Sequence, residues 1–122
     1  MINYIAIFIG GGLGSLCRYV ISKFSTSFFD GNFPLGTFIS NTLSCIILAI
    51  SVLLFANKID ASTTLKLFLI TGFCGGFSTF STFSFETFEL LKSGNYFVAI
   101  LNILLSVIVG VGLIYILLKN QG

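Results

Sequence analysis

Four apolar stretches, each long enough to cross a membrane, constrain the fold of this chain more than any other feature. A helix needs about 20 apolar residues to span the hydrocarbon core of a bilayer. Of the whole chain, 56% is hydrophobic and only 8% is charged, which is more apolar surface than a soluble domain of this size can bury. We therefore expect an all-α membrane protein with a single domain, residues 1–122, and four transmembrane helices. The stretches are Asn3–Ile21, Pro34–Ala56, Leu65–Leu91 and Tyr96–Leu118.

The third stretch does not have the composition of one continuous helix. Its centre holds Gly72, Gly75 and Gly76, and glycine inside a helix costs about 1 kcal/mol relative to alanine. Hydroxyl groups and phenyl rings then alternate from Ser78 to Phe85. Because irregular backbone survives in a membrane only where protein or a polar cavity covers it, we predict a third helix that is broken in mid-membrane and lines a site. Close packing of small residues against another helix is the simpler alternative.

The broken stretch would offer two kinds of ligand. At its turn, Gly75–Ser78, backbone carbonyls lose their helical partners, and clustered carbonyls of this kind coordinate cations such as Na+. Phe80 and Phe83 follow three residues apart and lie near one face, where their positive ring edges can approach an anion without donating a proton. Ser81 and Thr82 add hydroxyl donors beside the rings.

Polar side chains also recur in the second and fourth stretches. One face of the second helix would carry four of them at helical spacing, namely Thr37, Ser40, Asn41 and Ser44. A carboxamide in mid-membrane is costly unless its donors and acceptor are used. Asn41 therefore either joins two helices or presents its NH2 group to an anion. In the fourth stretch, Asn102 and Ser106 lie four residues apart and could continue a polar stripe beside the third helix.

The basic residues are evenly divided between the two sides of the membrane. Four crossings place both termini on one side, and orientation normally follows the Lys/Arg excess. With no excess, we hypothesise that the chain inserts both ways up and that two opposite copies pair about a twofold axis in the membrane plane; an accidental balance of a few charges is the alternative. The side of the termini would carry Lys58, Lys66 and Lys119, and the other side Arg18, Lys23 and Lys92.

Two charged residues near the ends of the stretches, Arg18 and Glu86, each have two possible roles. Arg18 lies inside the end of the first stretch, beside Tyr19, where a charge has to snorkel or pair. It would either anchor the helix at the interface or create a positive potential that gathers anions at a pore mouth. Glu86 would either pair with a basic group or cap a polar pocket, and Glu89 would face solvent.

The residue types exclude several classes of function. The chain has no His, its three Cys have no metal-site spacing, and it has no phosphate-binding loop or nucleophile motif. A net charge of only +2 gives no reason to expect a nucleic-acid partner. The interior is rich in neutral donors and lacks the mid-membrane carboxylate or lysine of a proton-coupled pump. We therefore expect no enzyme but passive permeation of a small anion, whose hydration water is replaced by fixed donors in a narrow path.

Three motifs, spread over essentially the full length, resemble a known family. Gly72–Phe83 matches GxxGGx(T)TFSTF, Gly10–Gly14 followed by Arg18 and Tyr19 matches a GGxxG and Arg-Tyr pair, and Pro34–Asn41 matches PxGTxxxN. By these motifs the chain is similar to the Fluc (CrcB) fluoride channels. The resemblance implies a multi-pass protein of the bacterial plasma (inner) membrane that forms a dual-topology, antiparallel homodimer with two fluoride pores.

The resemblance also implies site residues. A structural Na+ on the twofold axis would be held by the main-chain carbonyls of Gly75 and Ser78, with Ser78 standing where the family usually has Thr. The Arg at the position of Arg18 lies near the aqueous vestibule in that family. The fluoride pathway would comprise the ring and amide positions Phe80, Phe83 and Asn41, and a polar track to which Ser81, Thr82, Asn102 and Ser106 would correspond.

We therefore expect a passive, fluoride-selective channel that exports cytoplasmic fluoride. A small multidrug-resistance-type, proton-coupled antiporter is the first rival, because it shares four helices and dual topology. It relies on a membrane-embedded Glu in the first helix, whereas the first stretch here contains no acidic residue. A non-transporting assembly factor or chromosome-associated membrane factor is the second rival, and it leaves the hydroxyl and phenyl pattern unexplained.

Overall fold

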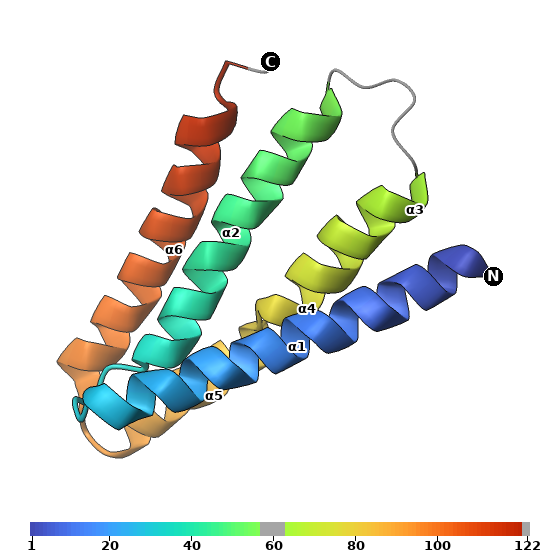
Figure 1. Ribbon diagram of the computed structural model, residues 1–122. Coiled ribbons are helices and arrows are strands. Elements are labelled where there is room, and N and C mark those ends of the chain that lie inside the picture. Colours follow the sequence, from blue (N-terminus) through green and yellow to red (C-terminus); the bar gives the residue numbers. More distant parts are fainter. Residues whose placement is uncertain (57–62, 121–122) are drawn as a thin grey trace.

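The computed structural model describes residues 1–56 and 63–120, and the regular structure in these two parts is helical (Figure 1). Four spans are long and apolar enough to cross a membrane, as predicted. The predicted place of Lys58 lies outside the described residues. The first, second and fourth spans are the helices α1 (Ile2–Phe28), α2 (Leu35–Ala56) and α6 (Tyr96–Leu118). The third span is built from α3 (Thr63–Lys66), η1 (Leu67–Cys74), α4 (Gly75–Phe77) and α5 (Phe80–Lys92).

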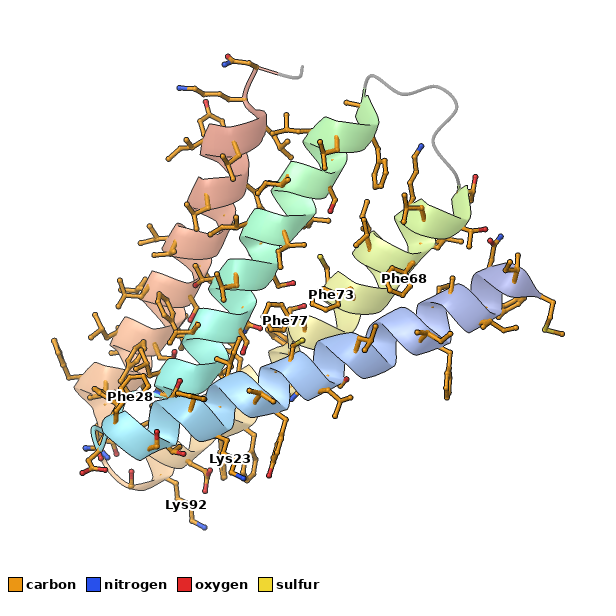
Figure 2. The ribbon with its side chains drawn as sticks, in the orientation of Figure 1. Lys23, Phe28, Phe68, Phe73, Phe77 and Lys92 are labelled. Atoms are coloured by element: carbon orange, nitrogen blue, oxygen red, sulfur yellow. The ribbon has the colours of Figure 1, made fainter. Side chains whose placement is uncertain are left out.

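Helix α1 continues beyond the predicted end at Ile21, over residues that lie between the first two predicted stretches. The hydroxyls of Thr26 and Ser27 donate to the carbonyls of Lys23 and Phe24, at 2.9 and 2.7 Å, and so follow the helix. Serine and threonine favour loops because their side chains compete for backbone groups, but these two bond within the last helical turns. Lys23 and Lys92, labelled in Figure 2, lie at the same end of the molecule, as the predicted division of charges requires.

The third span is broken, as predicted, but the break is centred later than Gly75–Ser78. Residues Leu67–Cys74 form a π-helical stretch, and Gly75–Phe77 still form a helical turn. The chain is extended only at Ser78 (φ −90°, ψ 157°) and Thr79 (φ −153°, ψ 116°). Helix α5 then begins at Phe80, where the Thr79 side chain accepts a hydrogen bond from the Thr82 N–H group. This N-cap, rather than the glycines, sets where the helix resumes.

The glycines instead allow close helix packing, so the simpler alternative for them is also correct. Helix α1 packs along η1 and α4 (Figure 1). A Cβ atom on Gly14 would collide with the carbonyl oxygen of Phe73, and one on Gly76 would collide with the carbonyl oxygen of Gly11. Small residues thus bring the two backbones together. The rings of Phe73 in η1 and Phe77 in α4, labelled in Figure 2, have centroids 5.4 Å apart.

Helices α2 and α6 form the other packed pair, and α5 joins it through a tight turn. The turn contains Gly94 at φ +88°, a left-handed conformation that favours glycine. The N–H groups of Gly94 and Asn95 donate to the carbonyls of Leu91 and Leu90, at 3.2 and 2.8 Å, which is the Schellman arrangement at a helix end. The turn sends α6 back past α5 and α2 (Figure 1).

The surface and the interior of the described chain are inverted relative to a soluble protein. Large apolar side chains such as Phe8 and Phe97 are exposed, whereas the predicted polar stripe of α2 is largely buried, with Thr37, Ser40 and Ser44 inside. A long apolar exterior of this kind suits lipid. Together with the four spans, it identifies a multi-pass integral membrane protein.

Candidate functional site

The break in the third span is held by the side chain of Asn41 on α2. The Thr79 N–H group donates to Asn41 Oδ1 at 2.8 Å, and Asn41 Nδ2 donates to the Thr79 carbonyl oxygen at 3.4 Å. Asn41 therefore does join two helices, which was one of its two predicted roles. An amide nitrogen carries two hydrogens, and the contact to Thr79 uses one of them at a long distance. The geometry thus leaves a donor for the second role.

The first half of the broken helix ends in carbonyls with different partners. The Cys74 carbonyl accepts from the Ser78 N–H group at 3.0 Å, the Ser78 hydroxyl at 2.8 Å and the Ser44 hydroxyl at 3.1 Å. The Gly76 carbonyl accepts from Arg18 Nε at 3.1 Å. Arg18 therefore caps the broken helix, a contact that was not considered from the sequence, and its guanidinium brings positive charge to the break.

The carbonyls of Gly75 and Ser78 both lose their regular helical donors. In a continuous helix they would accept from the N–H groups of Thr79 and Thr82. Here Thr79 donates to Asn41 Oδ1, and Thr82 donates to Thr79 Oγ1 at 3.2 Å. Gly75 is also exposed. Neutral carbonyl oxygens released in this way suit a hard cation such as Na+, so the donor set fits the predicted site.

A pocket of about 270 Å³ lies beside the break. It draws side chains from α2, from the break itself, and from α5 and α6. The rings of Phe80 and Phe83 form one part of its wall, with centroids 5.9 Å apart and planes inclined at 39°. No residue of the wall carries a formal charge. The lining residues are Asn41, Cys45, Ser78, Thr79, Phe80, Phe83, Ser106 and Val107.

Four of the predicted pathway residues thus meet in one pocket, namely Asn41, Phe80, Phe83 and Ser106. Ser81 and Thr82 are not part of the wall but are tied to it through Thr79. The Thr79 hydroxyl lies 3.1 Å from Thr82 Oγ1, to which it donates, and 3.3 Å from Ser81 Oγ. A string of hydroxyls therefore leads away from the pocket along the first turn of α5.

Asn102 lies behind the pocket rather than in its wall. Its side chain is almost fully buried, with 1% exposed. Asn102 Nδ2 donates to Thr87 Oγ1 at 3.0 Å, and Asn102 Oδ1 accepts from the Ser106 hydroxyl at 3.4 Å. The structure therefore brings Asn102 to the predicted site through its hydrogen-bond partners, Ser106 in the wall and Thr87 behind it.

A second pocket, of about 380 Å³, opens at the end of the molecule where the turn between α5 and α6 lies. Glu86 and Glu89 both line it, and Glu89 is exposed as expected. Glu86 is half-buried, lies next to Thr37 on α2, and has one carboxylate oxygen buried without a hydrogen-bond partner among the described residues. Capping a polar pocket is thus the role of Glu86 that the geometry favours.

Sequence reasoning missed four residues of the site. Thr79 could have been predicted as an N-cap, because threonine is favoured immediately before a helix, where its side-chain oxygen accepts from the N–H group three residues later. Cys45 follows Asn41 by one helical turn and so lies on the same face. Val107 and Thr87 gave no signal, since their roles depend on how α6 packs against α5.

Comparisons with known proteins find similar sequences along most of the chain. The family model described as "CrcB-like protein, Camphor Resistance (CrcB)" matches residues 5–118. A protein of Pyrococcus abyssi named "Fluoride-specific ion channel FluC" is 44% identical over 110 residues, which cover 90% of this chain and 88% of that protein. Proteins of the same name from Azobacteroides pseudotrichonymphae and Chloroflexus aurantiacus are 45% and 40% identical, over 84% and 93% of this chain and 82% and 95% of theirs.

The match to the family model reaches all four spans and every lining residue of the two pockets. The family model alone begins in α1 and ends with the last residue of α6. The chain therefore belongs to the CrcB family.

Proposed function

We propose that this protein is a passive, fluoride-selective ion channel that exports cytoplasmic fluoride across the bacterial plasma membrane. The relatives named as fluoride-specific channels support the ion. The observation that carries the proposal is the uncharged pocket beside the break, where two phenyl rings, an amide and hydroxyl groups converge from three membrane spans. The same residue set offers no nucleophile and base pair for catalysis.

Neutral donors are suited to an ion that must enter and also leave. Fluoride holds its hydration water tightly, so a dry path has to replace that water with strong donors. A hydrogen bond to a charged partner contributes about 1.5–3 kcal/mol, and several are needed at once. Asn41 Nδ2 and the Ser106 hydroxyl supply such bonds, while the edges of Phe80 and Phe83 add weak positive potential. A fixed opposite charge would instead trap the ion.

Ser81 and Thr82 extend the proposed pathway beyond the pocket. Their hydroxyls form a continuous hydrogen-bonded set with Thr79, so an ion leaving the phenyl rings meets further donors. Arg18 at the break adds positive potential from the other side. Asn102 belongs to this pathway as support for Ser106, whose hydroxyl it accepts from.

We further propose that the working form is an antiparallel homodimer with two pores. Phe80 is 79% exposed, and Ser81 is exposed as well. A broken backbone with exposed hydroxyls is not tolerated against lipid, so another protein surface has to cover it. A second copy in the opposite orientation is the partner that the balanced Lys and Arg residues favour.

A Na+ ion would stabilise this dimer. The Gly75 and Ser78 carbonyls, freed at the break, are the groups that would hold it, together with those of the second copy. When bound, the ion supplies a positive charge close to the buried anion path and links the two broken helices. The residues of the chain cap the helix ends and shape the pocket.

Ion efflux from liposomes tests the proposal. Vesicles that contain the purified protein and are loaded with KF or KCl are diluted into an impermeant salt, and valinomycin is added to carry the counter-ion. We expect rapid fluoride efflux and little chloride efflux. Equal rates for the two anions, or none, would reject a fluoride-selective channel, and efflux of an organic cation driven by a proton gradient would indicate the antiporter instead.

A further inference from the structure

We propose that Thr87 and Asn102 are positioning residues that set the orientation of Phe83 without contacting the ion. Both residues lie outside the wall of the 270 Å³ pocket, yet each is bonded to a group that belongs to it. The inference rests on the proposed function only in taking Phe83 as part of the fluoride pathway.

A directed chain of hydrogen bonds connects the two walls of the pocket. On α6, the Ser106 hydroxyl donates to Asn102 Oδ1 at 3.4 Å. Asn102 Nδ2 donates across to Thr87 Oγ1 on α5 at 3.0 Å, and the Thr87 hydroxyl donates to the Phe83 carbonyl oxygen at 2.8 Å. This series of hydrogen bonds starts at the lining residue Ser106 and ends at the lining residue Phe83. Its two middle residues are not part of the pocket wall.

The burial of the two middle residues makes this arrangement specific. Asn102 is 1% exposed and Thr87 is 7% exposed, inside two membrane spans. Polar groups at such positions destabilise the fold unless they are bonded, so neither side chain can turn away without leaving its partner unsatisfied. A threonine hydroxyl that bonds the carbonyl four residues earlier also tends to bend a helix. Thr87 thereby fixes the tilt of the turn that carries the Phe83 ring.

The same series of hydrogen bonds also orients the Ser106 hydroxyl. Because its proton points to Asn102 Oδ1, an anion in the pocket has to compete with an amide oxygen for that proton. The competing bond is long, so the hydroxyl can turn to the ion when it arrives. Asn102 therefore holds Ser106 in register for the pocket while Thr87 holds Phe83.

Variants that remove one bond at a time test this inference by two measurements. The first is fluoride efflux of the full-length protein in liposomes. The second is the ¹⁹F resonance of 4-fluorophenylalanine placed at position 83, which reports the ring environment without requiring any flux. The variants are T87V, T87S, N102L and the double variant T87V/N102L, with T26V as the matched control. Thr26 also bonds a backbone carbonyl of its own helix but lies at the exposed end of α1.

We expect T87V and N102L each to lower fluoride efflux about tenfold or more, because a misplacement of about 1 Å of a working group can change a rate by up to about a hundredfold. Both should shift or split the ¹⁹F resonance. T87S keeps the hydroxyl and should restore both readings, the double variant should be no worse than the more affected single variant, and T26V should match the wild type. In the F83I background, T87V should have no further effect on efflux, whereas a merely structural role would lower efflux again.

An unshifted ¹⁹F resonance in T87V and N102L would overturn the proposal, as would additive effects of the two substitutions. If T87V does not assemble, T87A removes the same hydroxyl with a smaller side chain and decides in its place. A wild-type protein that carries no fluoride would refute the proposed function, while the ¹⁹F comparison would still decide whether Thr87 and Asn102 position Phe83.

Discussion

Asn41 and Thr79 exchange two hydrogen bonds across the point where the third span is broken. The amide oxygen of Asn41 takes the N–H group that a continuous helix would give to Gly75, and its nitrogen donates to the carbonyl of the same threonine. One side chain of α2 thus replaces a turn of helix. Because the contact joins two spans, the break is stabilised by tertiary structure and does not depend on the local sequence alone.

We predict that replacing Asn41 by alanine lowers both stability and fluoride efflux. The variant leaves the Thr79 N–H group without its partner in mid-membrane, which costs about 1–3 kcal/mol for a buried group, and it removes a donor from the pocket. Thermal unfolding in detergent and liposome efflux are the measurements. Asn3 is the matched control, because its amide also joins two helices, by accepting from Thr64 Oγ1 at 2.7 Å, but far from the pocket. Wild-type efflux by N41A would remove Asn41 from the pathway.

The phenyl rings should act on the ion and not on the assembly. We predict that F80I and F83I each reduce fluoride efflux while dimer formation, measured by cross-linking or size-exclusion chromatography, stays intact. Isoleucine keeps the apolar volume but has no positive ring edge. F97I is the control, since Phe97 is 76% exposed on α6 and is not part of either pocket. Unchanged efflux in both F80I and F83I would exclude the rings from the mechanism.

The space around the glycines of α1 predicts how alanine substitutions change stability. A Cβ atom at Gly14 would collide with the Phe73 carbonyl oxygen, whereas one at Gly12 meets nothing within 4 Å. We expect G14A to destabilise the protein by about 1–3 kcal/mol through overpacking, and G12A to be neutral or to stabilise α1 by up to about 1 kcal/mol. Thermal unfolding of the two variants, side by side, is the measurement. Equal melting temperatures would show that α1 can move away from η1 at no cost.

The fold was largely predictable because hydropathy and break signals are local. The spans agree with prediction except for the end of α1, where Thr26 and Ser27 bond within the helix. The break was predicted a few residues early, because Gly72 and Gly76 serve packing against α1 and do not interrupt the helix. The site was only partly predictable. Four pathway residues meet in one pocket, but the partners of Arg18 and Asn102 depend on contacts between spans, which no single stretch of sequence contains.

The balanced charges lead to a prediction about orientation. We expect a tag at the C-terminal end, beyond Lys119, to be accessible from both faces of the membrane in comparable amounts, because neither face has an excess of Lys and Arg. Protease protection in inverted and right-side-out vesicles measures this. Adding two lysines near Lys119 should shift the population toward one orientation and, by removing opposite partners, reduce efflux. A tag found on one face only in the unmodified protein would exclude a dual-topology dimer.

The last prediction concerns the cation at the break. If the carbonyls of Gly75 and Ser78 hold Na+ in the dimer, a ligand at about 100 times its Kd stabilises the folded assembly by about 2.7 kcal/mol. The melting temperature of the purified dimer should therefore fall when NaCl is replaced by N-methyl-D-glucamine chloride at equal ionic strength. S78T should respond like the wild type, because the Ser78 hydroxyl is bonded to Cys74 and only the main-chain carbonyl is available to a cation. N41A should respond less, because without the Asn41 side chain the extended backbone that presents the Gly75 and Ser78 carbonyls is no longer held in place. A melting temperature that does not depend on Na+ would exclude a stabilising Na+ at these carbonyls, whose partners would then be water or groups of the second copy.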